Sequence, residues 1–226
     1  MPAIKITPSI LTADLGNLEA EVRAVEAAGA DYLHLDVMDG HFVPPITFGE
    51  LVIAAIRKIT SLPLDIHLMI EQPERQVEAF ARAGGDILNV HVEACTHVHR
   101  VLAQIKALDR KAGVCVNPAT PLSAIEEVLG EADQIIVMGV NPGWGGQKLI
   151  PETLPKIRRL RAMLDERNLS ADIEIDGGVK AGNIADCVRA GACIIVAGSS
   201  VYNDDAPVAE NMRTLRAAIA TAESRA

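Results

Sequence analysis

The chain has 226 residues, enough for one large domain or two small ones, and 49% of them are apolar, so a full core can form. A formal net charge of −9 argues against nucleic acid or an anionic membrane surface as the main partner, but it is compatible with a small anionic ligand at a local site. No signal peptide or membrane-spanning apolar run is visible, and the four cysteines lack zinc-site spacing, which together predict a cytoplasmic protein with reduced thiols.

Strand-like segments alternate with helical segments along the whole chain. Strands are predicted, in chain order, at residues 5–11, 31–38, 64–70, 86–91, 111–117, 133–139, 171–176 and 193–197. Helices are predicted between and after them at residues 14–28, 48–60, 73–84, 96–108, 121–129, 151–167, 180–190 and 206–224. Similar Ala-Gly phrases at residues 28–31, 83–86 and 190–192 indicate one repeated helix-to-strand turn.

These segments form eight strand–helix units of about 28 residues each. A unit this short has room only for a strand, a helix and tight loops, so parallel crossovers are expected. Eight units in this length predict an α/β fold with a single (β/α)8 TIM barrel as one domain over residues 1–226. The doubly wound open sheet is disfavoured because no Gly-x-Gly-x-x-Gly follows the first strand.

The stretch from residue 33 to 40 places unusual residues on one face of a buried strand. Because strand side chains alternate with period two, His34, Asp36 and Met38 point the same way. Burying an ionisable pair without partners is expensive. A structural ion pair, a metal site and a catalytic acid/base all remain possible explanations at this point.

Further polar residues stand at the carboxyl ends of other strands, where the active sites of such barrels lie. His67 ends the third strand, next to the second, and Asp176 ends the seventh, on the opposite side. Together with His34 and Asp36 they make two imidazoles and two carboxylates, a set suited to Zn, Fe, Mn or Co. The alternative is a buried His–Asp network that fills the barrel end.

Glycine-rich loops follow the last three predicted strands. Barrels of this kind often bind phosphate there through backbone N–H groups, and the alternative for each loop is a tight turn. No arginine lies in these loops, and Lys148 and Lys180 are the nearest cations. The candidate substrate-binding residues in these loops are Gly143, Trp144, Gly145, Gly146, Gly177, Gly178, Gly198 and Ser199.

Other residues near the strand ends allow two interpretations each. Met38, Met69 and Met138 are either an apolar collar around a reacting ligand or barrel core. Ser9 either contacts a ligand or closes a local turn. We interpret His91, Glu93, His97 and His99 as surface or structural residues, and Asp39 with Gly40 as turn chemistry.

Several long motifs in this chain resemble the ribulose-phosphate 3-epimerase family, nearly end to end. They are Ser9-Ile10-Leu11 with Asp14, Leu35-Asp36-Val37-Met38-Asp39-Gly40-His41-Phe42-Val43-Pro44, Asp65-Ile66-His67-Leu68-Met69, His91-Val92-Glu93, Asn141-Pro142-Gly143-Trp144-Gly145-Gly146-Gln147, Asp176-Gly177-Gly178 and Ala197-Gly198-Ser199. The family usually has Phe where Trp144 stands and Asn where Pro45 stands, which leaves the details of loop closure open.

The resemblance implies a (β/α)8 barrel that interconverts D-ribulose 5-phosphate and D-xylulose 5-phosphate, in the pentose phosphate pathway or the Calvin cycle. It implies one divalent transition metal on His34, Asp36, His67 and Asp176, which stabilises an enediolate. Asp36 and Asp176 would be the two acid/base groups at C3. The implied substrate contacts add Ser9, His67 and Asp176 to the glycine loops, and the implied assembly is a homo-oligomer, a dimer or a hexamer.

Four alternative functions differ in the residues that they require. An epimerase acting on a hexulose 6-phosphate such as allulose 6-phosphate shares the motifs, and a non-catalytic phosphosugar-binding barrel could keep the glycine loops. A Schiff-base aldolase needs a lysine at a strand's carboxyl end, whereas Lys5 and Lys111 lie toward strand starts. The Asp-x-Lys-x-x-Asp motif of related decarboxylases is absent from the sequence.

Overall fold

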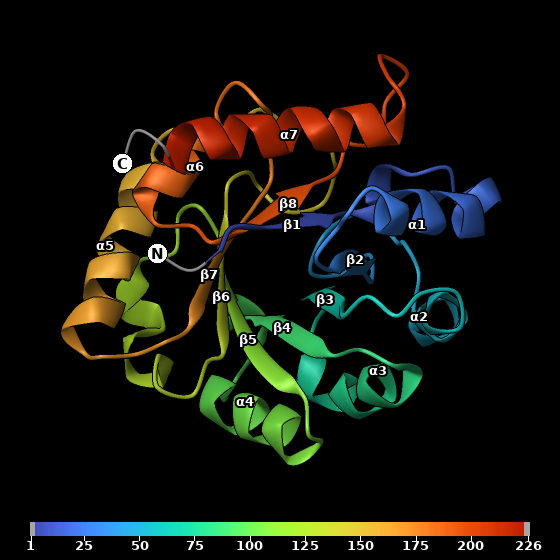
Figure 1. Cartoon of the computed structure of the whole chain (residues 1–226). Helices are drawn as coiled ribbons and strands as arrows, with labels where there is room; N and C mark the ends of the chain where they lie inside the picture. Colours follow the sequence, from blue (N-terminus) through green and yellow to red (C-terminus); the bar gives the residue numbers. More distant parts are fainter. Residues whose placement is uncertain (1–2, 224–226) are drawn as a thin grey trace.

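The computed structural model describes residues 3–223 and shows eight parallel strands surrounded by helices (Figure 1). The strands are β1 (Lys5–Pro8), β2 (Leu33–Met38), β3 (Leu64–Met69), β4 (Ile87–His91), β5 (Lys111–Val116), β6 (Gln134–Met138), β7 (Asp172–Asp176) and β8 (Ile194–Ala197). Their order in the sheet is β1-β8-β7-β6-β5-β4-β3-β2. A parallel bridge between Ser9 and His34 links the two edge strands, so the barrel is nearly closed.

Seven α-helices occur within residues 3–223. They are α1 (Leu18–Ala27), α2 (Glu50–Arg57), α3 (Val77–Ala83), α4 (Val98–Ala107), α5 (Thr153–Glu166), α6 (Ile184–Ala190) and α7 (Val208–Glu223). Short 3₁₀ helices stand at η1 (Ile10–Thr12), η2 (Leu15–Asn17), η3 (Pro73–Arg75), η4 (Val92–Ala94), η5 (Leu122–Ala124) and η6 (Glu126–Val128). The predicted α/β barrel is therefore confirmed. None of the helices in this part of the chain has the length and apolar character to span a membrane.

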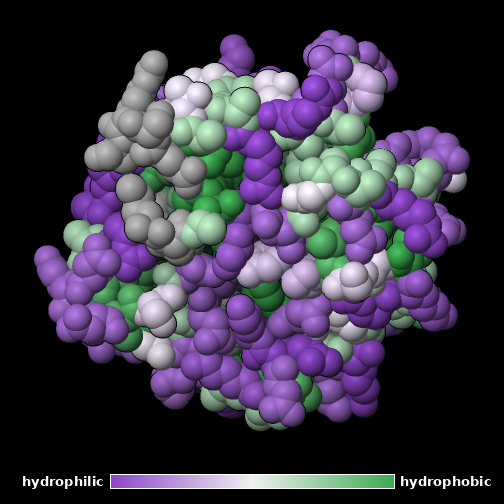
Figure 2. All heavy atoms as spheres, viewed as in Figure 1, coloured by the Kyte–Doolittle hydropathy of each residue, from purple (hydrophilic) through white to green (hydrophobic). Residues whose placement is uncertain are grey.

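The period-two alternation of the strands divides the interior into two regions. Outward-facing Leu33, Leu35 and Val37 of β2 belong to the main apolar core, which also includes buried helix residues such as Val22 and Ile53. The inward face carries polar side chains in the barrel. The outer surface of the molecule is largely hydrophilic on the face drawn in Figure 2, with apolar side chains showing between the hydrophilic ones.

The repeated Ala-Gly joints are turns that end helices, as expected. Gly84 follows α3 with φ 111° and Gly191 follows α6 with φ 112°, both in the left-handed region that favours glycine. Asp14 caps a helix start as predicted, but the helix is η2: its side chain accepts the Gly16 N–H at 2.9 Å, and α1 begins only at Leu18.

The predicted helix at 73–84 is divided into η3 and α3, and two further predicted segments also differ from the structure. The first strand ends at Pro8, because Ser9 Oγ accepts the Leu11 N–H at 3.2 Å and starts the η1 turn. The predicted helix at 121–129 is instead the pair η5 and η6, separated at Ile125, whose φ of −118° and ψ of 0° are not α-helical. No α-helix therefore covers the connection between β5 and β6.

A buried lysine from the next helix holds this connection. Lys156 in α5 is 5% exposed, and its ammonium group donates to the carbonyl oxygens of Asn117 (2.9 Å), Pro118 (2.7 Å) and Thr120 (2.7 Å). Burial lowers the pKa of Lys156, yet the three carbonyl oxygens supply the hydrogen bonds that its donors require. The side chain thus replaces the missing helix as the support of this loop.

We expect Lys156→Met to lower the free energy of unfolding by about 1–3 kcal/mol, because three carbonyl groups lose their donor. Arg159→Met is the matched control, since Arg159 lies on the exposed side of the same helix. Urea denaturation of both variants measures the difference. Equal unfolding free energies for the two variants would contradict the support assigned to Lys156.

Candidate active site

The register between β2 and β3 brings the predicted site residues together. Asp36 pairs with His67, and His34 pairs with Asp65, so an imidazole and a carboxylate lie side by side at two successive levels. All four side chains point into the barrel and are buried. Asp176, from the end of β7, reaches the same point from the opposite side and is 13% exposed.

The four groups converge closely at the barrel mouth. His67 Nδ1 lies 3.1 Å from Asp36 Oδ1 and 3.3 Å from Asp176 Oδ2. His34 Nε2 lies 3.3 Å from Asp36 Oδ1 and 3.9 Å from Asp176 Oδ2. One donor atom from each residue falls within 4.8 Å of all the others. We call these four residues the mouth cluster.

The donor set of the mouth cluster fits a divalent transition metal. His34 Nε2 is buried without a hydrogen-bond partner, although it faces two carboxylates. Burial raises the pKa of Asp36, but the neighbouring His34 and His67 outweigh it and hold that pKa well below its usual range. Two imidazole nitrogens and two carboxylates could therefore hold a cation here.

A second polar layer lies below the mouth cluster. Asp65 Oδ2 is 2.8 Å from His34 Nδ1, and Asp65 Oδ1 accepts hydrogen bonds from Asn89 (2.7 Å) and Gln134 (2.9 Å). Gln134 also donates to Glu174 at 2.9 Å. Burial and the charge of Asp65 raise the pKa of Glu174 well above its usual range. The partners of Asp65 fix it beneath His34, so the second ring nitrogen of His34 faces the cluster.

Sequence reasoning missed most of this layer. Asn89, Gln134 and Glu174 were assigned no role, although each is a polar residue at an inward position of a buried strand. The same period-two test that selected His34 and Asp36 would have selected them.

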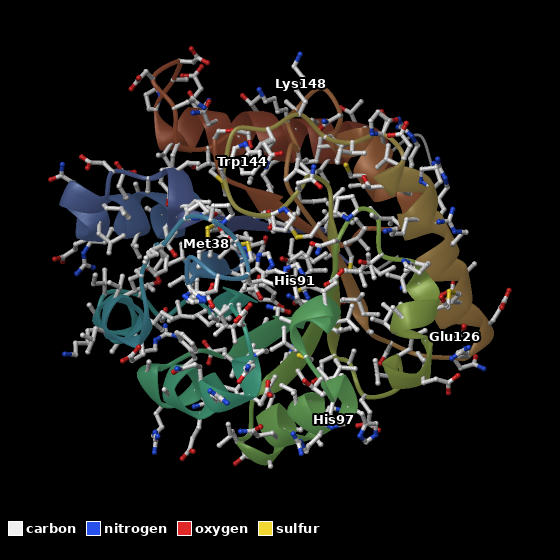
Figure 3. All side chains as sticks on the ribbon, turned by 180° about the vertical axis from the view of Figure 1, so that it is seen from behind. Met38, His91, His97, Glu126, Trp144 and Lys148 are labelled. Atoms are coloured by element: carbon white, nitrogen blue, oxygen red, sulfur yellow. The ribbon has the colours of Figure 1, made fainter. Side chains whose placement is uncertain are left out.

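The interpretation of His91 as a surface or structural residue left two positions open, and the structure decides between them. His91 is fully buried, and its Nε2 lies 2.9 Å from His67 Nε2, so a surface position for it is wrong. Figure 3 shows His91 in the middle of the barrel and His97 at the periphery. His97 and His99 are exposed, as expected for surface residues.

A cavity opens above the mouth cluster. Asp36 and Asp176 form part of its floor, and Ser9 Oγ donates to Asp36 Oδ2 at 2.6 Å. His67 lies beneath and is fully buried. The cavity is also lined by the three candidate collar residues Met38, Met69 and Met138, and by the predicted loop residues Gly143, Trp144, Gly145, Gly146, Gly177, Gly178, Gly198 and Ser199.

The glycine loops have the backbone conformation that their composition predicts. Gly178 has φ 73°, and a Cβ there would lie 2.2 Å from the backbone nitrogen of Leu149, so only glycine fits. Trp144 remains 56% exposed at the edge of the cavity. Lys148 extends away from the barrel in Figure 3 and is exposed, as is Lys180. Backbone groups of these loops and the side chains of Asn141, Gln147 and Ser199 are the polar features of this side of the cavity.

Comparison with known proteins agrees with these observations. The family model described as "Ribulose-phosphate 3 epimerase family" matches residues 5–202. The chain is 56% identical over 202 residues to the ribulose-phosphate 3-epimerase of Synechocystis sp. (88% of each chain covered). It is 52% identical to the Bacillus subtilis enzyme of the same name (88% and 92% covered) and 45% identical to that of Escherichia coli (92% and 94% covered).

Among solved structures, a 3-hexulose-6-phosphate synthase superimposes with a TM-score of 0.72 at 20% identity, covering 95% of this chain and 99% of the other. At that identity the similarity shows only the shared barrel. The sequence matches go further, because they extend over most of the chain and include the strand ends that form the mouth cluster. The chain is an enzyme and belongs to the ribulose-phosphate 3-epimerase family.

Proposed function

We propose that this enzyme interconverts D-ribulose 5-phosphate and D-xylulose 5-phosphate by inverting the configuration at C3. The observation that carries the proposal is a pair of carboxylates, Asp36 and Asp176, that approach one point of the cavity floor from β2 and β7. Inversion at a carbon requires that a proton leave from one face and return to the other. Two opposed carboxylates meet that requirement.

In this mechanism Asp36 accepts the C3 proton of D-ribulose 5-phosphate, and Asp176 donates a proton to the opposite face. The proton at C3 is acidic enough to transfer because C3 is next to the C2 carbonyl, so its loss gives an enediolate. Ser9 Oγ holds Asp36 Oδ2 at 2.6 Å, which orients the carboxylate before the reaction. In the reverse direction the two aspartates exchange roles.

His34, Asp36, His67 and Asp176 would hold one divalent transition metal, Zn, Fe, Mn or Co. When bound, such an ion would stabilise the negative charge that develops on the substrate oxygens. The buried His34 Nε2 without a partner supports this assignment.

The glycine loops after β6, β7 and β8 would bind the phosphate of the substrate through backbone N–H groups. Met38, Met69 and Met138 would exclude water around the reacting carbon, because their apolar side chains line the same cavity. Trp144, at the cavity edge, would cover the bound sugar. The substrate is thus a small phosphosugar, and pathway use, a homo-oligomeric assembly and a cytoplasmic location remain predictions.

We expect Asp36→Asn and Asp176→Asn each to lower kcat by roughly 10²–10⁴-fold, because an amide cannot exchange the proton. A coupled assay with D-ribulose 5-phosphate measures the loss, and circular dichroism checks that the fold is intact. Asp39→Asn is the control: Asp39 accepts the His41 and Phe42 N–H groups and lies outside the cavity wall, so kcat should stay near that of the wild type. Near wild-type turnover in either cavity variant would reject the two-base scheme.

In D₂O we expect substrate to gain deuterium at C3 and at no other carbon, since only that proton passes through the aspartates. Proton NMR of the recovered sugar phosphates measures the position of the label. Deuterium at C1 would indicate an aldose–ketose isomerase and contradict the proposal. The same assay with allulose 6-phosphate tests the hexulose alternative.

Removal of divalent ions with a chelator should abolish turnover, because the negative charge on the substrate would lose its stabilisation. Zn, Fe, Mn or Co should restore turnover better than Ca or Mg, which favour all-oxygen sites. Metal analysis of the purified enzyme accompanies the assay. Full activity in protein shown to be free of metal would refute the assignment of the mouth cluster as a metal site.

A further inference from the structure

His67 is connected to two residues outside the mouth cluster. Its Nδ1 faces Asp36 and Asp176, whereas its Nε2 lies 2.9 Å from His91 Nε2 on the other side of the ring. The two rings are nearly stacked, with centroids 5.1 Å apart. His91 Nδ1 in turn lies 3.2 Å from Glu93 Oε2. Three side chains thus form one hydrogen-bonded chain leading away from the cluster.

At the outer end of this chain, the hydrogen bond between His91 and Glu93 can have only one donor. Glu93 Oε1 accepts the backbone N–H of Asn117 at 2.8 Å and the hydroxyl of Thr120. An ionised carboxylate has acceptors only. Burial raises the pKa of Glu93, but hydrogen bonds from His91, Thr120 and Asn117 outweigh it and lower the pKa to about 2. His91 Nδ1 must therefore carry the proton in its contact with Glu93 Oε2.

The position of the proton on His91 also determines which nitrogen of His67 is protonated. Next to a His67 that binds a cation, a neutral His91 ring is favoured over a second positive charge. With its proton on Nδ1, the neutral His91 ring presents the lone pair of Nε2 to His67. A hydrogen bond at 2.9 Å needs one proton between the two Nε2 atoms, and His67 must supply it. The proton of neutral His67 is thereby held on Nε2, and its Nδ1 lone pair is directed at the mouth cluster.

We propose that Glu93 and His91 are positioning residues that fix the tautomer of His67, so that Nδ1 is its ligand atom. The inference rests on the proposed metal site and deepens it. His34 provides a contrast, because Asp65 binds its Nδ1 and leaves Nε2 for the cluster. The two histidines therefore offer different ring nitrogens, each selected by its own partner.

Cys115 lies close to both His67 and His91, and the three could themselves be read as ligands of a second ion. The separation of 2.9 Å between the two Nε2 atoms is that of a hydrogen bond, and an ion between them would break the chain to Glu93. The hydrogen-bonded interpretation also explains why Glu93 is anchored by two donors.

The test uses Glu93→Gln, which replaces one carboxylate oxygen by an amide nitrogen. The carbonyl oxygen of the glutamine would take the Asn117 and Thr120 donors, so its NH₂ group would face His91 Nδ1. The proton of His91 would then move to Nε2. Two N–H groups, those of His91 Nε2 and His67 Nε2, would then point at each other, and one of them would have to change. We expect the dissociation constant for Zn²⁺, measured by competition with a fluorescent chelator, to rise about 10–100-fold.

Three further variants separate this effect from damage to packing. His91→Leu removes the acceptor and should weaken Zn²⁺ binding to a similar extent, while His91→Gln retains an oxygen near the position of Nε2 and should restore most of the affinity. Ile136→Val, a buried change on the inner face of β6, should leave affinity unchanged. Nitrogen-15 NMR of the Zn²⁺-loaded wild type should show His67 protonated at Nε2.

Wild-type affinity in Glu93→Gln and His91→Leu, or His67 bound to the ion through Nε2, would overturn the inference. Failure of the wild type to bind Zn²⁺ would overturn it together with the metal site. If the wild type binds Zn²⁺ and the variants weaken it as expected, but D-ribulose 5-phosphate is not turned over, the positioning role stands and the proposed reaction fails.

Discussion

Burial of charged groups inside a nearly closed barrel is the constraint that organises this site. Each ionisable side chain on the inner face of β2 and β3 has lost most of its water, and only specific partners can compensate. The strand register supplies them in alternation, His34 beside Asp65 and Asp36 beside His67. The polar layer below the mouth adds partners from β4, β6 and β7, which complete the hydrogen bonds of Asp65 and Glu174.

The sequence predicted the barrel and the mouth cluster because both depend on local periodicity. Strand parity put His34 and Asp36 on one face, and the order of strands put Asp176 opposite them. The same approach failed at residues 121–129, where support from Lys156 in a distant helix takes the place of an α-helix. It also left His91 undecided between a surface and a structural position, because its ring contacts His67 and Phe42, which are far from it in the chain. Contacts with residues that are remote in sequence cannot be predicted from local periodicity.

The side chains inside the barrel also need neighbours of the right size. A Cβ on Gly113 would lie 1.8 Å from Asn89 Oδ1, so the glycine of β5 provides the room in which Asn89 reaches Asp65. The polar residue on one strand can therefore be accommodated only if the adjacent strand carries a glycine at this position. The orientation of His34 therefore depends on a position that carries no functional group.

The lysine that supports the β5–β6 connection has a wider role than local stability. The carbonyls that it binds belong to the segment whose Asn117 N–H and Thr120 hydroxyl hold Glu93. An outer helix is thus joined mechanically to His67 through a loop, a carboxylate and a histidine. Transfer of this loop into another barrel, or replacement of α5 in a chimaera, would have to carry both pieces together, because Lys156 and the loop jointly hold the carboxylate that contacts His91.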